Sequence, residues 1–150
     1  MAEPARQALS EETVPLHSRR YGDYDVPLER VLTFPDGLIG FADARRFVLL
    51  DSPRPDSPFR CLVCVDFPEL GFVVCDPLGL WPAYAAELPP VDEGRAEDRA
   101  ALVIVTVPHD PHAMTANLLA PLLFDCTTRT GRQVVLDAER YSIRHQLLPG

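Results

Sequence analysis

Two cysteines, Cys61 and Cys64, have the spacing of zinc ligands and of redox pairs. The surrounding residues 59–67 have the pattern of a β-strand, in which alternate side chains face opposite sides. An offset of three in a strand puts the two sulfurs on opposite faces, whereas a metal-binding pair sits in a tight turn. We therefore expect ordinary buried cysteines here, with a metal or redox pair as the alternative.

A second candidate for chemistry is the segment His109-Asp110-Pro111-His112, which holds two imidazoles and a carboxylate. It is suited to weak metal binding, but it follows the apolar run 101–107, and its position at the end of a strand predicts a capped turn instead. A Cys–His pair for nucleophilic catalysis has no local signature. No nucleophile elbow, phosphate-binding loop, dinucleotide fingerprint or zinc-protease motif is present, so the sequence predicts no enzyme, metal or cofactor.

The charge of the chain restricts its partners. The 150 residues carry a net charge of −8, and all 14 basic residues are arginines. Such a protein repels RNA and attracts basic proteins, because binding to nucleic acid depends on positive charge.

No run approaches the ~20 apolar residues of a membrane span, and no signal peptide is visible. We expect a cytoplasmic protein that binds neither nucleic acid nor membrane, with four free thiols.

The fold class follows from short apolar runs and frequent breaks. The 16 prolines are spread along the chain and favour short strands over long helices. We expect an all-β fold, a small antiparallel β-barrel-like domain with one or two short helices, over residues 21–150. Residues 1–20 lack a period and are expected to form a flexible tail. The expected strands are residues 24–28, 30–34, 46–50, 59–67, 72–75 and 101–107, and the expected helix is residues 81–88.

The longest predicted supersecondary element is a hairpin over residues 115–136. Its apolar first arm is residues 117–124, its turn is 125–132, and its return arm is 133–136. Pro121 has no N–H to donate, which places it at an edge or a bulge.

One loop carries more apolar residues than a solvated loop should. Pro35, Asp36 and Gly37 specify a turn, yet apolar residues surround them. These apolar residues must therefore either plug the core or form a contact surface, and both alternatives remain open. They are Phe34, Leu38, Ile39 and Phe41.

Several motifs in a fixed order carry a family resemblance. They are Phe34-Pro35-Asp36-Gly37-Leu38-Ile39-Gly40-Phe41, Ser57-Pro58-Phe59, Leu70-Gly71-Phe72-Val73-Val74 followed by Asp76-Pro77 and Tyr84, and Thr115-Ala116-Asn117-Leu118-Leu119-Ala120-Pro121 followed by Gly131, Gln133 and Val134. Together they span roughly residues 24–148. In this order the chain resembles the flagellar assembly factor FliW family of bacteria, although residues 1–20 precede the family's usual start.

The resemblance implies a non-catalytic binding protein. Members of the family bind the RNA-binding translational repressor CsrA, which releases the repression of flagellin synthesis, and they also bind flagellin. On charge and exposure, the candidates for partner contacts are the apolar residues Leu38, Ile39 and Phe41 and the acidic residues Glu69, Asp76, Glu87, Asp92 and Glu93. The alternatives are a small β-barrel that binds a cofactor or nucleotide, and a structural subunit of an assembly.

Overall fold

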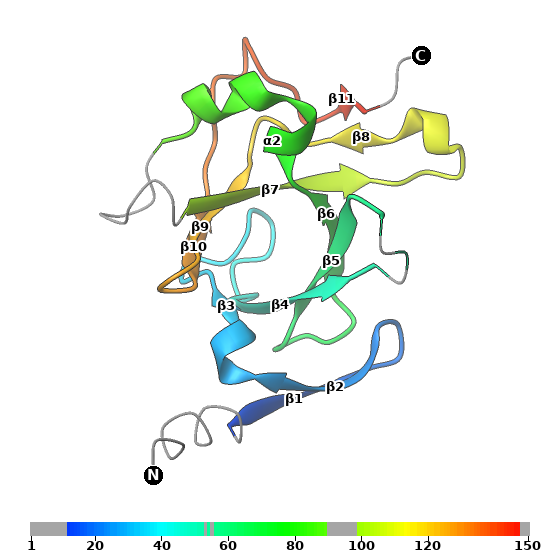
Figure 1. Cartoon of the computed structure of the whole chain (residues 1–150), viewed down its shortest axis with the longest axis vertical. Helices are drawn as coiled ribbons and strands as arrows, with labels where there is room; N and C mark the ends of the chain where they lie inside the picture. Colours follow the sequence, from blue (N-terminus) through cyan, green and yellow to red (C-terminus); the bar gives the residue numbers. More distant parts are fainter. Residues whose placement is uncertain (1–11, 53, 55, 90–98, 148–150) are drawn as a thin grey trace.

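The fold consists of short strands with a few helical turns (Figure 1). This computed structural model describes residues 12–52, 54, 56–89 and 99–147. The strands are β1 (Thr13–Ser18), β2 (Gly22–Pro27), β3 (Leu32–Thr33), β4 (Arg46–Asp51), β5 (Phe59–Cys64), β6 (Gly71–Cys75), β7 (Arg99–Thr106), β8 (Thr115–Ala116), β9 (Leu122–Asp125), β10 (Thr130–Gln133) and β11 (His145–Gln146). The helical segments are η1 (Leu28–Arg30), α2 (Pro77–Leu80), η2 (Pro82–Glu87) and η4 (Pro111–Ala113).

The main sheet closes on itself. Its strand order is β11-β8-β7-β6-β5-β4-β3-β10-β9, and β9 pairs back to β7. The first half of β7 pairs with β9, while its second half pairs with β6 and β8. The pairing of β3 with β10 is parallel, and the other pairings in the sheet are antiparallel. The predicted all-β, barrel-like fold is therefore confirmed, and β7 covers most of the strand expected at residues 101–107.

The interior of the ring is filled by one hydrophobic cluster to which β3–β7 and β9 contribute. Phe34 and Phe47 are its largest fully buried side chains. Their rings meet edge to face, with centroids 5.7 Å apart, the geometry in which an aromatic pair gains beyond its buried area. The barrel is thus a packed core.

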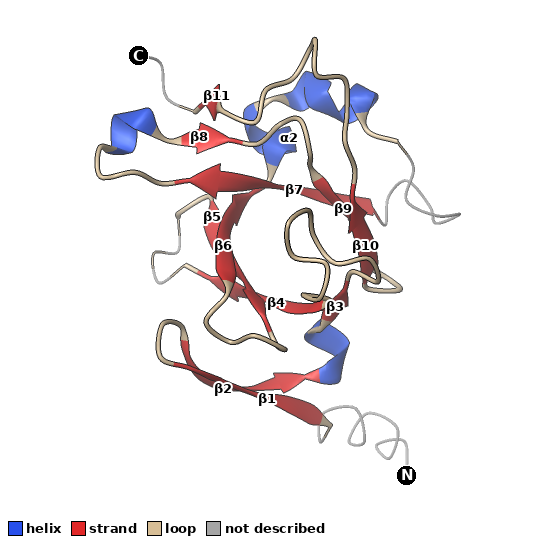
Figure 2. Ribbon diagram, turned by 180° about the vertical axis from the view of Figure 1, so that it is seen from behind, coloured by secondary structure: helices blue, strands red, loops and turns tan. Residues whose placement is uncertain are grey.

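The loop between β3 and β4 closes one end of the barrel (Figure 2), where it lies inside the ring of strands. We call this end, where β3 ends and β4 and β6 begin, the plugged end. Phe34 and Leu38 are buried there. Gly37 has φ +70°, and a Cβ atom on it would lie 2.4 Å from the carbonyl oxygen of Ala42. Only glycine fits this turn without strain. Of the two alternatives for this loop, Phe34 and Leu38 plug the core.

The N-terminal tail was predicted wrongly over part of its length. Residues 13–18 form β1, which pairs with β2 as a separate hairpin outside the barrel. Leu16 is fully buried, together with Val26, against the outer face of β4 and β5. The alternation in β1 is short and carries Pro15 and His17, so it gave no convincing period. Residues 1–11 lie outside the described residues.

The predicted hairpin over residues 115–136 exists, but its strands and turn differ from the prediction. Asp125 pairs with Thr130, so the connection is residues 126–129, not 125–132. Oδ1 of Asp125 accepts hydrogen bonds from the backbone N–H groups of Thr127 and Thr128, at 2.7 and 3.1 Å. This carboxylate tightens the turn, and the return strand begins at Thr130. Pro121 directly precedes β9, consistent with its missing N–H.

The helix expected at residues 81–88 is present as the 3-10 helix η2, with the short helix α2 before it. Tyr84 in η2 is buried, and its hydroxyl donates a 2.6 Å hydrogen bond to the carbonyl oxygen of Leu118. Burial raises the pKa of the Tyr84 hydroxyl, which keeps it protonated as a donor. This bond ties the helical segment to the segment that precedes β9.

Replacing Tyr84 by phenylalanine should lower the free energy of unfolding by about 1–3 kcal/mol, the cost of leaving a buried acceptor without a partner. Urea denaturation followed by circular dichroism measures this change. Tyr24→Phe is the matched control, because Tyr24 is exposed on β2 and should change stability by less than about 0.5 kcal/mol. Equal effects of the two changes would show that the Tyr84 bond contributes no stability.

Candidate partner-binding surface

The two cysteines with metal-like spacing lie where the strand pattern placed them. Cys61 and Cys64 are both in β5, which ends at Cys64. Cys64 points into the barrel cluster, whereas Cys61 packs toward the β1–β2 hairpin. Burial raises the pKa of the Cys64 thiol, and it raises that of Cys75 to about 11. Both thiols therefore stay protonated at neutral pH, and a protonated thiol is a poor nucleophile.

The histidine segment forms the capped turn that its position predicts. Oδ1 of Asp110 accepts a 3.0 Å hydrogen bond from the backbone N–H of His112. The carbonyl oxygen of Asp110 accepts a second one from Ala113, which closes η4. Across the described ranges, no group of three or more His, Cys, Asp or Glu residues is arranged to hold a metal ion. The described helices include none that is long and apolar enough to cross a membrane.

Large apolar side chains gather instead at the plugged end. We call Ile39, Phe41 and Phe67 the apolar patch; they are 60%, 42% and 48% exposed. The ring of Phe41 meets that of Phe72 edge to face at 5.4 Å, which fixes its position. Residues 40–44 line a hollow of about 290 Å³ together with Phe67 and Leu70. A hollow of this size has room for an apolar side chain.

The backbone explains why these side chains are exposed. Leu38 and Phe41 bond to each other across a two-residue turn, which puts Ile39 at its tip. The N–H of Ile39 donates a 2.7 Å hydrogen bond to the side-chain oxygen of Gln133 on β10. This hydrogen bond attaches the turn to β10, so the apolar patch has a fixed position on the barrel.

The sequence prediction identified this patch only in part. Leu38 is buried and belongs to the core, whereas Ile39 and Phe41 reach the surface. Phe67 was not predicted as a candidate contact residue, because the strand pattern extended to residue 67 and treated it as part of the strand. In the structure β5 ends at Cys64, and Phe67 lies in the following connection.

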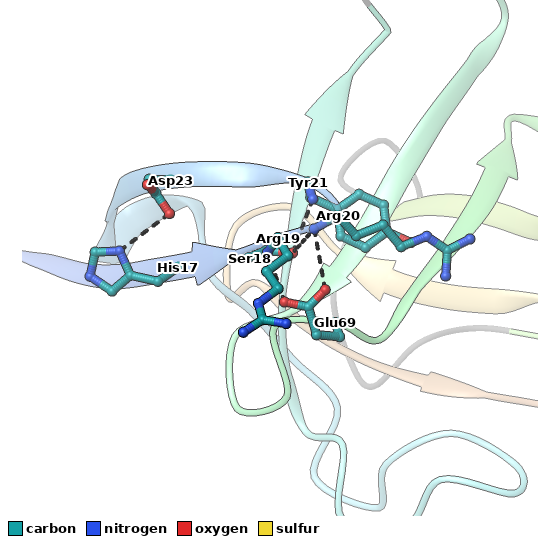
Figure 3. A network of polar contacts seen from close by, with 7 residues as sticks. All are labelled: His17, Ser18, Arg19, Arg20, Tyr21, Asp23 and Glu69. Carbon is teal, nitrogen blue, oxygen red and sulfur yellow. Dashed lines mark hydrogen bonds and ion pairs between the residues drawn. The ribbon is translucent and has the colours of Figure 1, made fainter.

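Glu69 holds the β1–β2 hairpin onto the barrel (Figure 3). Its two carboxylate oxygens accept hydrogen bonds from the backbone N–H groups of Arg19 and Arg20, at 2.8 and 3.2 Å. The Tyr21 side chain lies over Gly71, where a Cβ atom would come within 2.5 Å of the Tyr21 hydroxyl. Glu69 was predicted as a partner contact, and the structure gives it this intramolecular role.

The other acidic candidates are also engaged within the chain or lie outside its described part. Asp76 caps α2 by accepting a 2.8 Å hydrogen bond from the N–H of Leu78. Glu87 forms an ion pair with Arg140. Asp92 and Glu93 lie outside the described residues. The charged residue that lines the hollow of the apolar patch is Asp43, which charge alone did not single out.

Replacing Glu69 by alanine should loosen the hairpin, because two backbone donors lose a charged acceptor. We expect a loss of about 1 kcal/mol of local stability, measured as faster hydrogen exchange at the amides of Arg19 and Arg20. Asp23→Ala is the matched control, since Asp23 contacts His17, 3.4 Å away on the same exposed hairpin (Figure 3). Unchanged exchange at both amides in Glu69→Ala would contradict the role of Glu69.

Comparison with known proteins places the chain in a family. A sequence model described as FliW protein matches residues 15–147. The chain belongs to the FliW family. The flagellar assembly factor FliW of Symbiobacterium thermophilum is 39% identical over 128 residues, which cover 82% of this chain and 93% of the relative. That of Bdellovibrio bacteriovorus is 41% identical over 137 residues, which cover 88% of this chain and 78% of the relative.

The fold comparison agrees with this assignment. A crystal structure of the flagellar assembly factor FliW superposes with a TM-score of 0.78 at 31% identity, covering 91% of this chain and 98% of that chain. The family match begins at residue 15, inside β1. The expectation that residues 1–20 precede the start of the family is therefore wrong for residues 15–20, which belong to the FliW domain.

Proposed function

We propose that this protein is a non-catalytic, cytoplasmic flagellar assembly factor that binds and antagonises the translational repressor CsrA. It also binds flagellin, so that flagellin synthesis is coupled to flagellin secretion. The observation that carries the proposal is the match to the FliW family over residues 15–147. The opposite orientations of Cys61 and Cys64 and the capped turn add support, because neither candidate for chemistry is arranged for catalysis.

The apolar patch is the surface that this function uses for CsrA. Exposed apolar side chains with a polar rim are typical of protein-binding sites. Ile39, Phe41 and Phe67 supply the apolar part, while Asp36 and Asp43 are exposed acidic residues of the same loop. A basic partner that inserts an apolar side chain into the hollow complements both features. The net charge of −8 adds attraction at longer range.

Surface plasmon resonance with immobilised CsrA tests the proposal. The association rate should fall as salt rises, because the Debye length shrinks from about 30 Å at 0.01 M to about 10 Å at 0.1 M. The dissociation rate should change far less. Absence of binding by folded protein at low salt would contradict the proposed function, whereas binding with a constant association rate would contradict the electrostatic contribution alone.

A pair of variants with equal charge change locates the attraction. Asp36→Asn combined with Asp43→Asn should slow association by about threefold or more, because both carboxylates lie beside the proposed contact. Asp56→Asn combined with Glu139→Gln removes the same charge from exposed positions outside this loop and should slow association less. Equal slowing by the two pairs would show that only the net charge matters.

A further inference from the structure

A cleft lined by arginines lies at the barrel end opposite the plugged end. At this end β4 and β9 finish and β3 and β5 begin, as the register of the strands requires. We call it the arginine cleft; it has a volume of about 250 Å³. Its charged lining residues are Arg30, Arg60, Arg129, Glu29 and Asp51, and its apolar lining residues include Leu32, Leu49 and Phe124. Three arginines around one cleft are unexpected in a chain with a net charge of −8.

The backbone fixes where the three arginines stand. Arg30 ends η1, and Arg60 lies on β5. Arg129 has φ 56°, a conformation that residues other than glycine rarely adopt. Its N–H donates to the carbonyl oxygen of Asp125, and its own carbonyl oxygen accepts from Thr33, at 2.7 and 2.8 Å. The turn therefore holds Arg129 at the cleft from both sides.

The charged groups of the three arginines are unpaired within the described part of the chain. None of the side chains of Arg30, Arg60 and Arg129 makes a hydrogen bond or an ion pair there. Asp51 stands opposite Arg60 in the β4–β5 register, yet the two form no ion pair. By contrast, Arg46 at the plugged end binds Asp66 through two donors, at 3.0 and 2.7 Å. The cleft thus has donors available for an anion.

We propose that the arginine cleft binds a carboxylate carried on an apolar group. Guanidinium groups bind carboxylates in a bidentate manner, and the walls formed by Leu32, Leu49 and Phe124 suit an apolar body next to the charge. A phosphate would leave these apolar walls without a partner. The volume is below the roughly 300–1,000 Å³ of typical small-molecule sites, so a single side chain or a small acid fills the cleft.

Two sources of this chemistry can be distinguished with small probes. The free-acid probe is 3-phenylpropionate, with 3-phenylpropionamide as its neutral counterpart. The peptide probe is N-acetyl-Glu-Phe-amide, with N-acetyl-Gln-Phe-amide as its counterpart, and inorganic phosphate is the third anion. Nuclear magnetic resonance of the arginine side-chain N–H groups in the full chain reports binding at each arginine. Tighter binding of the peptide acid identifies a polypeptide ligand, and tighter binding of phenylpropionate identifies a small acid.

We expect at least one acid probe to saturate the signals of Arg30, Arg60 and Arg129, while the amides leave them unchanged. Arg129→Gln and Arg30→Gln should each weaken binding about tenfold, the loss expected for one charged hydrogen-bonding partner. Arg144→Gln, an exposed arginine elsewhere in the chain, is the matched control. Circular dichroism verifies that each variant folds, and Arg30, which lies in a short surface helix, is the change least coupled to the barrel.

Three results would overturn the proposal. They are the absence of saturable shifts with either acid, equal binding of acids and amides, and binding of phosphate as tight as that of the acids. The cleft lies away from the apolar patch, and its test contains no CsrA or flagellin. Its outcome is therefore independent of the proposed function.

Discussion

Replacing Phe47 by alanine is expected to lower the free energy of unfolding by about 3–5 kcal/mol, the range for a large aromatic side chain removed from a packed core. Phe47 on β4 is fully buried, and its ring contacts that of Phe34 edge to face. Both residues belong to the cluster that fills the ring of strands. The variant therefore leaves a cavity where the loop of the plugged end meets the barrel wall.

Urea denaturation followed by circular dichroism measures this loss. Val135→Ala serves as the control, because Val135 is exposed and its truncation should cost less than about 0.5 kcal/mol. A loss below about 1 kcal/mol for Phe47→Ala would contradict the packed interior, since it would mean that the ring encloses little of the core.

The second large effect is expected on binding. Ile39→Asp combined with Phe67→Asp should weaken binding to CsrA at least about 100-fold, because interface hot spots are worth about 2 kcal/mol or more each and 1.4 kcal/mol is a factor of ten. Two new carboxylates would replace the apolar part of the patch. Most of the change should appear in the dissociation rate, since short-range contacts act after the encounter.

Leu80→Asp is the matched control for this pair. Leu80 is 44% exposed on α2, which follows the end of β6 that lies away from the plugged end. It adds an exposed carboxylate without touching the patch, so the dissociation rate should stay the same. Binding of the double variant with wild-type affinity would exclude the apolar patch as the contact surface, while the family assignment would stand.

Much of the barrel could be predicted from periodicity, because strands buried on two faces have strong apolar patterns. The strands β4 and β7 and the opposite orientations of Cys61 and Cys64 follow from this pattern. The β1–β2 hairpin could not be predicted, since Leu16 and Val26 are the only buried apolar residues in its two strands. Its attachment depends on Glu69, about fifty residues away in sequence, and no local pattern encodes such a contact.

The candidate site was harder to predict than the fold for a physical reason. A sequence gives the charge of a residue but not its neighbour, and Glu69, Asp76 and Glu87 are engaged with backbone donors or an arginine. The apolar loop was the better indicator, because Ile39 cannot be buried at the tip of a two-residue turn. The arginine cleft brings together residues from η1, β5 and the β9–β10 turn, which no spacing along the chain connects.

The most direct test of the proposed function is the release of RNA from CsrA. Fluorescence anisotropy of a labelled flagellin messenger RNA bound to CsrA should fall when this protein is added, because the protein itself repels RNA and takes the repressor away. Adding flagellin should restore the high anisotropy as it draws the protein off CsrA. An anisotropy that stays high with an excess of folded protein at low salt would contradict the account.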